Sequence, residues 1–457
     1  MTIDVQTVAD LGPDDRAAFF DRDAGIESVR GDVREIVERV RTEGDVAVRE
    51  YTSEFDDVEV GNLEITDDCE RAYDEIDDGM RDAIERAAAN VREFHEAQRP
   101  EDWRREFSEG RTLGRRFRPI ERVGVYVPGG SAAYPSSAIM GIVPAVVAGV
   151  DHVSVVTPPA DELNPVTLAA IHAAGADAVY CVGGAQAIAG MAYGTETITR
   201  VQKVVGPGNK WVTAAKAEVR GDVEIDFLAG PSEVVVVADG SADPELVAAE
   251  LVAQAEHDPN ASVVAVTDDA ETADAVAAAV DEQADARERE SVIREALEND
   301  ASGVLRARSM SEAILFAEEY APEHLSIIAE DDESLLERID SAGSVFLGPN
   351  TPVAAGDYAS GTNHVLPTNG GARVTGGLAV ETFLRSTTVQ RLSETGLADM
   401  GETITTLATA EGLEPTPRAS GVDSRTGRTT TNSHWKREED GFSRRNCGPV
   451  LRSWRPE

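Results

Sequence analysis

The chain has 457 residues, of which 41% are hydrophobic and 28% charged, a composition typical of a folded globular protein with more than one domain. Its 84 acidic residues outnumber 42 basic ones, and the net charge of -42 excludes a general nucleic-acid binder or a binder of anionic membranes. The chain has three widely spaced cysteines, no visible secretory leader, and no apolar run near the roughly 20 residues that span a bilayer. We therefore expect a reduced, cytoplasmic protein with no nucleic-acid or membrane partner.

The basic residues are unusual in kind, because only four are lysine and the others are arginine. A surface rich in carboxylates and poor in lysine suits a salt-rich cytoplasm, where ions screen the repulsion between like charges. We predict a halophilic protein, with an acidic protein from an ordinary cell as the alternative.

Residues 1–24 are predicted to form a polar arm that Phe19 and Phe20 anchor. Apolar residues at steps of three and four predict a helix from Gly25 and another over residues 78–98. Short β-branched runs then recur, each leading through a glycine or proline turn toward an alanine-rich stretch: residues 123–127, 152–156, 178–182 and 204–209. This alternation of strand, turn and helix predicts an α/β fold with a largely parallel sheet.

A second set of elements follows the first. It comprises predicted strands at 232–239, 262–269, 327–330 and 344–350, with helices over 244–257 and in the acidic region up to residue 299. Residues 348–376, rich in Gly, Pro, Asn and Thr, form a long loop of the kind that often carries function. After Glu414 the composition changes: residues 415–457 hold nine basic and five acidic residues without apolar periodicity, which predicts an unfolded tail.

Three pairs of residues could take part in catalysis or in metal or substrate binding. Gln254 and His257 lie three residues apart at the end of a predicted helix, so both side chains could reach one divalent cation, although such a histidine is often only a helix cap. Glu323 and His324 could act as a general acid/base pair or simply be an exposed loop pair. Asp357 and His364 lie in the long loop and could bind metal or substrate, or be ordinary turn residues.

The glycine turns match neither the dinucleotide fingerprint nor a phosphate-binding P-loop. Their backbone amides open predicted helices, however, and could hold a phosphate group. Lys203, Lys210 and Lys216 flank the turn GPGN and indicate an anionic ligand such as a dinucleotide, unless their clustering is chance.

Taken together, the motifs resemble the histidinol dehydrogenase family over about residues 25–414. They occur in the family's order and are VPGGSAAYPSSAIMGIVPA, GGAQAIA, GPGN, DFLAGPSEVVVVAD, QAEH, APEHL and GDYASGTNHVLPT. The resemblance implies two NAD-dependent oxidations that convert L-histidinol to L-histidine through L-histidinaldehyde. It also implies a homodimer with an active site shared between subunits and one zinc ion per subunit.

The resemblance assigns roles to individual residues. It implies Glu323 and His324 as the catalytic pair, and three zinc ligands that also contact substrate, namely Gln254, His257 and Asp357. His324 itself and three further residues are implied as substrate contacts, the latter being Ser232, His364 and Glu411. The implied NAD contacts are Tyr126, Gln186 and Asn209.

The implied architecture has two Rossmann-like parallel-sheet domains, a helical N-terminal arm and a small C-terminal helical segment. Residues 25–125 and 233–378 are expected to form the main domain, with the zinc and catalytic residues. Residues 126–232 are expected to form an inserted NAD-binding domain, and residues 379–414 a dimerisation segment.

One position departs from the family pattern. The family's fourth zinc ligand is a histidine five residues after the glutamate of an EGL motif, and Thr416 stands there in this chain. We interpret residues 415–457 as a product of a shifted reading frame, because a Pro-Thr pair encoded CCC-ACN contains the histidine codon CAC one base out of phase. A genuine tail is the alternative. Two other functions stay open: a related zinc and NAD enzyme acting on another amino- or hydroxy-alcohol, and an inactive chain.

Overall fold

The structure is a computed structural model that describes residues 3, 5–20, 22, 25–129 and 133–413. Thr416 and the predicted tail lie outside the described residues. The chain divides into two compact units. The first comprises Met1–Glu101 and Phe117–Ser386, and the second comprises Asp102–Arg116 and the chain from Thr387 onward.

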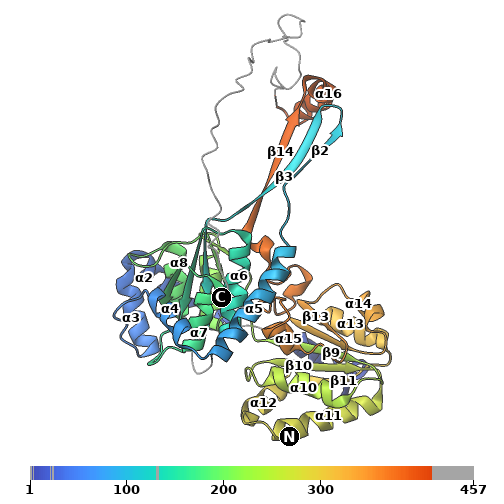
Figure 1. Ribbon diagram of the computed structural model, residues 1–457. Coiled ribbons are helices and arrows are strands. Elements are labelled where there is room, and N and C mark those ends of the chain that lie inside the picture. Colours follow the sequence, from blue (N-terminus) through green and yellow to red (C-terminus); the bar gives the residue numbers. More distant parts are fainter. Residues whose placement is uncertain (1–2, 4, 21, 23–24, 130–132, 414–457) are drawn as a thin grey trace, which may run out of the picture. The chain divides into compact units, whose positions relative to one another are not determined.

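Six parallel strands form one sheet of the first unit, in the order β1-β11-β10-β9-β12-β13 (Figure 1). Their bounds are β1 Val5–Thr7, β9 Glu233–Ala238, β10 Ser262–Thr267, β11 Gly303–Arg306, β12 His324–Ile328 and β13 Ser344–Leu347. Every residue of β9, which reads EVVVVA, is buried, as expected for a parallel strand covered on both faces.

Helices cover both faces of this six-stranded sheet. Val234 and Val236 share a core with residues of α10 (Pro244–Ala255), α11 (Ala270–Asp285) and α12 (Glu290–Leu297). Val235 and Val237 point to the other face, where they share a core with residues of α13 (Met310–Tyr320). Two short helices follow, α14 (Asp332–Leu336) and α15 (Val353–Tyr358).

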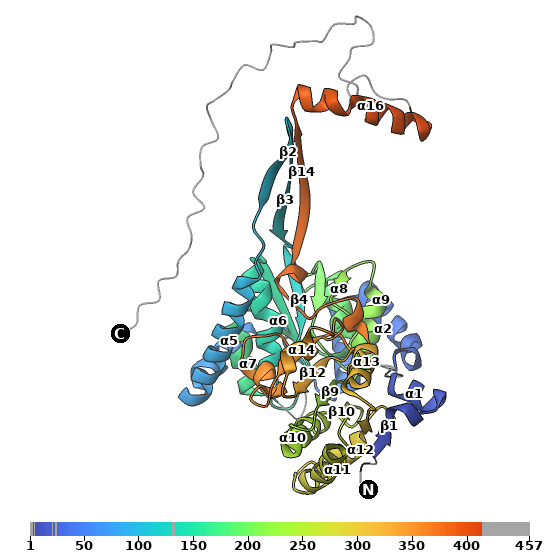
Figure 2. The same ribbon diagram turned by 90° about the vertical axis from the view of Figure 1, so that its right-hand side faces the viewer.

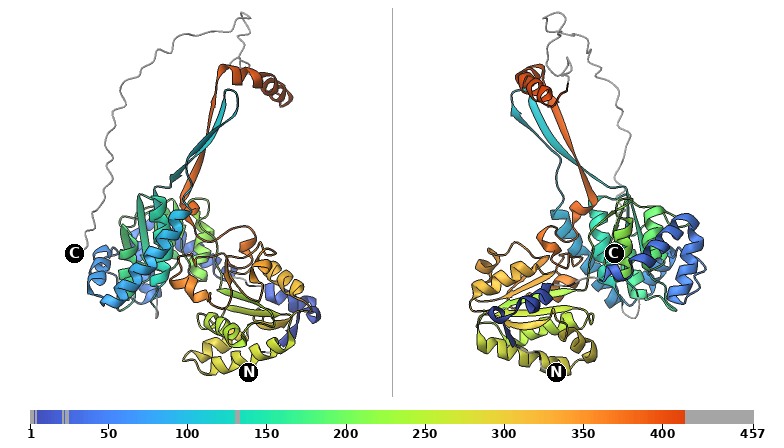
Figure 3. Two further views of the ribbon diagram at one scale, coloured as in Figure 1. Left: turned by 45° about the vertical axis from the view of Figure 1, so that its right-hand side comes forward. Right: turned by 180° about the vertical axis from the view of Figure 1, so that it is seen from behind.

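The N-terminal segment belongs to this sheet and is not a separate arm. β1 pairs in parallel with β11 at the edge of the sheet, with Val5 opposite Val304, and is drawn in dark blue in Figure 3. The helix α1 (Pro13–Phe20) follows, and Phe19 is only 2% exposed, so its predicted role as an anchor is confirmed. A three-residue edge strand shows no periodicity, which is why the sequence did not indicate it.

Five parallel strands form the second sheet of this unit, in the order β6-β5-β4-β7-β8. Their bounds are β4 Arg122–Tyr126, β5 His152–Thr157, β6 Ala178–Cys181, β7 Lys203–Val205 and β8 Glu224–Ile225. One face shares a core with α4 (Thr66–Glu75), α5 (Asp78–Ala97), α6 (Pro135–Ala148) and α7 (Pro165–Ala174). The other shares a core with α2 (Arg30–Glu43), α3 (Asp45–Asp56), α8 (Gly184–Tyr193) and α9 (Lys210–Val219).

The packing of α2–α5 differs from the expected domain division. We expected residues 25–125 to join residues 233–378, but α2 contacts α8 and α9, α4 contacts α7, and α5 contacts α6, all on the five-stranded sheet. The apolar stripe of α2 (Val33, Ile36, Val37 and Val40) is buried there. An apolar stripe predicts that a helix packs on something, but not which of two sheets receives it.

The second unit contains a β-structure that the sequence analysis missed. β2 (Trp103–Ser108) pairs antiparallel with β3 (Arg111–Pro119), and β3 also pairs with β14 (Leu384–Leu392). α16 (Glu394–Ala410) follows β14 at one end of this narrow ribbon (Figure 2). Every residue of β2 is exposed, so the strand lacks the alternation of apolar and polar residues that identifies a half-buried strand.

The main predicted strands and helices of the first unit are confirmed to within a few residues, with one shift that matters for the site. β12 begins at His324, three residues before the predicted strand at 327.

None of the helices in the described part of the chain has the length and apolar character that a membrane span requires.

Candidate active site

Glu323 and His324 lie at the amino end of β12, next to the amino end of β9. His324 is opposite Val234 in the sheet, and both residues of the pair are buried. Because α10 runs antiparallel to the strands it connects, its last turn also returns to this edge of the sheet. The edge therefore gathers β9, β12 and the end of α10, three elements that carry candidate residues.

The backbone of Glu233 holds both side chains of the pair. The Glu233 amide donates to Glu323 Oε2 at 2.9 Å, and the Glu233 carbonyl lies 3.1 Å from His324 Nδ1. A carbonyl can only accept, so Nδ1 carries a proton and the neutral imidazole has its lone pair on Nε2. His324 Nε2 is buried and has no hydrogen-bond partner among the described residues.

Charged groups surround His324. Its Nδ1 lies 3.5 Å from Glu323 Oε2, and its Nε2 lies 3.6 Å from Asp357 Oδ1. Burial by itself lowers the pKa of His324, but the two carboxylates outweigh burial and hold this pKa well above its usual value. The ring is therefore placed to accept and hold a proton at Nε2.

The expected loop at residues 348–376 is interrupted by α15, so Asp357 lies in a short helix and not in a loop. It connects the pair with a second histidine. Its Oδ1 lies 3.9 Å from His364 Nδ1, and its backbone carbonyl accepts a hydrogen bond from the same nitrogen at 3.0 Å. Burial acts to raise the pKa of Asp357, but His324, His364 and His257 together lower it. The carboxylate is thus ionised and close to three imidazoles.

The three expected zinc ligands come from two elements. Gln254 is buried at the end of α10, and its Nε2 has no hydrogen-bond partner among the described residues. His257, in the turn after α10, is exposed, and its amide donates to the Gln254 carbonyl at 3.2 Å. Within the described part of the chain, no group of three His, Cys, Asp or Glu side chains is arranged as a metal site. The expected set supplies only two such residues, His257 and Asp357, beside an amide.

These donors fit zinc chemically. Imidazole, carboxylate and an amide oxygen are ligands that zinc accepts. The unpartnered atom of Gln254 is the donor Nε2, which requires an acceptor, so only the amide oxygen of this side chain could bind zinc. The residue types of the three expected ligands therefore fit zinc.

The two remaining expected substrate contacts belong to different units. Ser232 immediately precedes β9, is partly buried, and accepts from the Ser262 amide through its carbonyl. Glu411 is exposed directly after α16 and belongs to the second unit.

The expected NAD contacts lie at the carboxyl edge of the five-stranded sheet. Tyr126 ends β4, and its hydroxyl accepts from the Gly184 amide at 3.3 Å. Gln186 is buried in the first turn of α8, and its Oε1 has no hydrogen-bond partner among the described residues. Asn209 caps α9, with Oδ1 accepting from the Trp211 and Val212 amides at 3.0 and 3.2 Å.

A shallow pocket opens at the same carboxyl edge, where nucleotides bind in many parallel sheets. Its lining is mostly apolar and consists of Pro128, Gly129, Thr157, Pro158, Ala160, Leu163, Asn164, Thr167 and Leu168. Its lining begins at Pro128, two residues after Tyr126, which is one of the expected NAD contacts.

The expectation that three lysines face an anionic ligand is wrong for two of them. Lys216 is buried, pairs with Asp226 and donates to the Gly206 carbonyl at 3.0 Å. Lys203 donates to the Thr382 carbonyl at 2.7 Å. Only Lys210 of the three is exposed. Buried lysines need partners within the protein, and a sequence does not reveal which lysines are buried.

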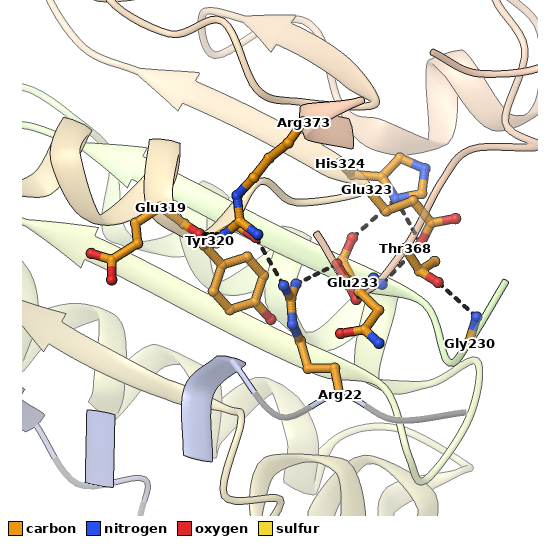
Figure 4. A network of polar contacts seen from close by, with 10 residues as sticks. Arg22, Gly230, Glu233, Glu319, Tyr320, Glu323, His324, Thr368 and Arg373 are labelled. Carbon is orange, nitrogen blue, oxygen red and sulfur yellow. Dashed lines mark hydrogen bonds and ion pairs between the residues drawn. The ribbon is translucent and has the colours of Figure 1, made fainter. Parts of the chain in front are cut away.

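A buried network that the sequence analysis did not identify adjoins the Glu323–His324 pair (Figure 4). Arg22 Nη1 lies 2.5 Å from Glu233 Oε2, and both side chains are almost completely buried. The signal that could have revealed it is the glutamate that begins an otherwise apolar buried strand, since a buried carboxylate requires a partner.

The chain is similar to known proteins of one family. The model of the histidinol dehydrogenase family matches residues 21–425. A histidinol dehydrogenase of Haloarcula marismortui is 75% identical over 90% of this chain and 97% of its own length. That of Halobacterium salinarum is 70% identical over 93% of this chain and 99% of its own.

A solved structure extends the match to the fold. The crystal structure of histidinol dehydrogenase from Elizabethkingia anophelis has a TM-score of 0.84 and 36% identity, covering 90% of this chain and 95% of that chain. With sequence and fold matched over nine tenths of its length, the chain belongs to the histidinol dehydrogenase family.

Proposed function

We propose that this chain oxidises L-histidinol to L-histidine through L-histidinaldehyde, using two NAD molecules. The observation that carries the proposal is the buried Glu323–His324 pair. The Glu233 backbone orients both side chains, and His324 Nε2 is left without a hydrogen-bond partner among the described residues. A base with a fixed tautomer and a free nitrogen suits removal of a proton from an alcohol.

His324 serves both oxidations in this proposal. Its Nε2 takes the hydroxyl proton of L-histidinol while the carbon loses hydride, which gives the aldehyde. Glu323 then accepts a proton from water as the water attacks the aldehyde, while His324 returns its proton to the aldehyde oxygen, which gives the hydrate. The neutral His324 then takes a hydroxyl proton from this hydrate as hydride leaves in the second oxidation. NAD, when bound, supplies the hydride acceptor for each step.

Gln254, His257 and Asp357 would hold one zinc ion per subunit. When bound, zinc would supply a fixed positive centre that orients the imidazole and amine of the substrate. The raised pKa of His324 belongs to the chain without a cation, because a cation on Asp357 would neutralise one of the two carboxylates that raise it. Ser232, His364 and Glu411 are proposed as further substrate contacts.

Tyr126, Gln186 and Asn209 are proposed to contact NAD. Asn209 Oδ1 already caps α9, so the amide Nδ2 is the atom left for a ligand. Helix N-termini after β6 and β7 supply backbone amides that favour phosphate groups.

Residues 379–414 are proposed to take part in a homodimer whose subunits share the active site. The second unit exposes large apolar side chains, among them Trp103, Phe107, Leu407 and Leu413. Several large apolar side chains exposed on one small unit favour burial against a second copy of the chain. The acidic, lysine-poor composition supports a salt-rich cytoplasm as the place of action.

The C-terminus decides whether the chain as written is fully active. If residues 415–457 come from a shifted reading frame, the natural protein has a histidine at position 416 and a fourth zinc ligand. Resequencing codons 411–420 tests this, and a clean read without a missing base would contradict it. If the tail is genuine, we expect lower zinc affinity than in a Thr416→His variant with a rebuilt C-terminus.

The proposed function is tested by counting NADH formed per L-histidinol consumed, in molar KCl with added zinc. Two NADH per substrate are expected. Turnover of another amino-alcohol in preference to L-histidinol would favour a related dehydrogenase, and a folded dimer without turnover would indicate an inactive chain.

A further inference from the structure

Glu233 connects three segments around the candidate site. Its backbone holds Glu323 and His324, and its side chain is 1% exposed. One carboxylate oxygen receives Arg22 Nη1 at 2.5 Å, and the other accepts from the Asn369 amide at 2.6 Å. The carboxylate therefore joins β9 to the N-terminal segment and to the loop that follows His364.

Arg22 contacts two segments next to the Glu323–His324 pair, namely β9 and the end of α13. Besides Glu233, it donates through Nη2 to the Tyr320 carbonyl at 2.8 Å, and its guanidinium lies 3.8 Å from the centre of the Tyr320 ring (Figure 4). Tyr320 ends α13, and only Ala321 and Pro322 separate it from Glu323. One planar guanidinium thus links β9 with the turn that leads into the pair.

That turn is short and has restricted geometry. Ala321 has φ of 50°, the left-handed region that a residue with a Cβ adopts at a cost. The surrounding structure must hold such a residue in place, and the bond from Arg22 to the Tyr320 carbonyl is immediately before it.

The loop after α15 is attached at the same place. The Gly230 amide donates to Thr368 Oγ1 at 2.6 Å, beside the bond from Asn369 to Glu233. This loop also contains His364 and follows Asp357 in the chain. A shift of Glu233 would therefore move both sides of the site, the Glu323–His324 pair and the loop opposite.

We propose that Arg22 and Glu233 form a buried clasp that positions Glu323 and His324 against the loop carrying His364. Both are positioning residues, since they act through groups of the site and not on the substrate. The inference rests on the proposed dehydrogenase function and adds to it a requirement for the N-terminal segment, which lies far from the site in sequence.

The test compares Arg22→Met, Arg22→Lys and Glu233→Gln with wild type in the full chain. Arg16→Met is the matched control, because Arg16 also comes from the N-terminal segment and pairs with Glu319 of α13, but at the exposed surface. For each protein we would measure kcat, KM for L-histidinol, KM for NAD, zinc content and melting temperature.

The clasp predicts that Arg22→Met and Glu233→Gln lower kcat by about 10–100-fold, the usual effect of losing a residue that supports a site, with both KM values changed much less. Arg22→Lys should recover part of the loss, because a single ammonium keeps the charge but cannot engage Glu233 and Tyr320 together in the same way. Arg16→Met should retain wild-type kcat.

If Arg22→Met does not fold, Arg22→Lys and Glu233→Gln decide the question by the same criterion. A lower melting temperature with kcat within twofold of wild type in the folded variants would overturn the clasp and leave Arg22 only a structural role. Wild-type turnover is measured first: its absence would refute the proposed function, whereas normal wild-type turnover with unaffected variants would refute the clasp alone.

Discussion

The two parallel sheets of the first unit are built alike, yet they present candidate site residues at opposite edges. The six-stranded sheet places charged side chains, Glu233, Glu323 and His324, at the amino ends of its strands. The five-stranded sheet places neutral ones, Tyr126, Gln186 and Asn209, where its strands lead into helices. The carboxyl edge supplies backbone amides for binding, whereas the amino edge must supply its chemistry through side chains.

The largest effect is expected from replacing the two ionisable side chains at the amino edge of the six-stranded sheet, Glu323 and His324. We expect Glu323→Gln and His324→Asn each to lower kcat by roughly 10²–10⁴-fold, the range that proton transfer by a positioned side chain contributes. NAD affinity, measured by fluorescence titration, should stay near wild type because its expected contacts lie on the other sheet. Equal losses of NAD affinity and kcat would show that the two edges do not have separate roles.

The buried carboxyl group of Glu233, at the same edge, should make the free energy of unfolding depend on pH. Burial raises the pKa of Glu233 to about 7, although Arg22 opposes this. The folded protein therefore holds a proton that the unfolded chain releases near pH 4.5, so stability should fall as pH rises from about 4.5 to about 7 and be level above that.

The size of this effect is of order 3 kcal/mol, from a shift of roughly two to three pH units at about 1.4 kcal/mol each. Glu233→Gln has no proton to lose, so it should lack this part of the slope. Unfolding by denaturant at several pH values in molar KCl measures it, and parallel curves for the two proteins would contradict the prediction.

Two glycines, one beside each group of candidate residues, allow the two sheet edges to be perturbed separately. A Cβ at Gly206 would lie 2.3 Å from the Tyr126 carbonyl oxygen, and one at Gly343 would lie 2.6 Å from the Glu323 carbonyl oxygen. Gly206 also has φ of 109°, so alanine there is strained as well as crowded. Each substitution should cost on the order of 1–3 kcal/mol of folding stability.

Their kinetic effects should differ. Gly206→Ala should mainly raise KM for NAD, and Gly343→Ala should mainly lower kcat, because each displaces the backbone beside a different candidate residue. Gly61→Ala is the control, since nothing lies within 4 Å of its added Cβ. The same kinetic defect in both variants would argue that the effects are general and not local to one edge.

The smallest effect is expected at Asn209, where two substitutions distinguish a role as a helix cap from a role in NAD binding. Asn209→Ala removes the cap of α9 and should lower stability by about 1 kcal/mol, whereas Asn209→Ser keeps a capping oxygen and most of that stability. Both lose the amide Nδ2, so both should weaken NAD binding to the same degree. If serine restores NAD affinity together with stability, Asn209 acts only as a cap.

Local sequence patterns predicted much of the fold. The runs that became β4, β5, β9 and β10 are rich in valine, and α2 and α5 have regular apolar stripes. Such patterns arise from contacts between near neighbours, so they can be read without the tertiary structure. β1 and β2 were missed because one is three residues long and the other is entirely exposed.

By itself, the sequence determined the α/β class, the family resemblance and the pairing of Glu323 with His324, because each depends on residues adjacent in the chain or on ordered motifs. Only the tertiary structure decided that α2–α5 pack on the five-stranded sheet, that Lys203 and Lys216 are internally paired, and that Arg22 reaches Glu233 across 211 residues. The physical reason is that burial and long-range pairing depend on which surfaces meet when the chain folds. Neither burial nor long-range pairing produces a periodic pattern or a fixed spacing of residues in the sequence.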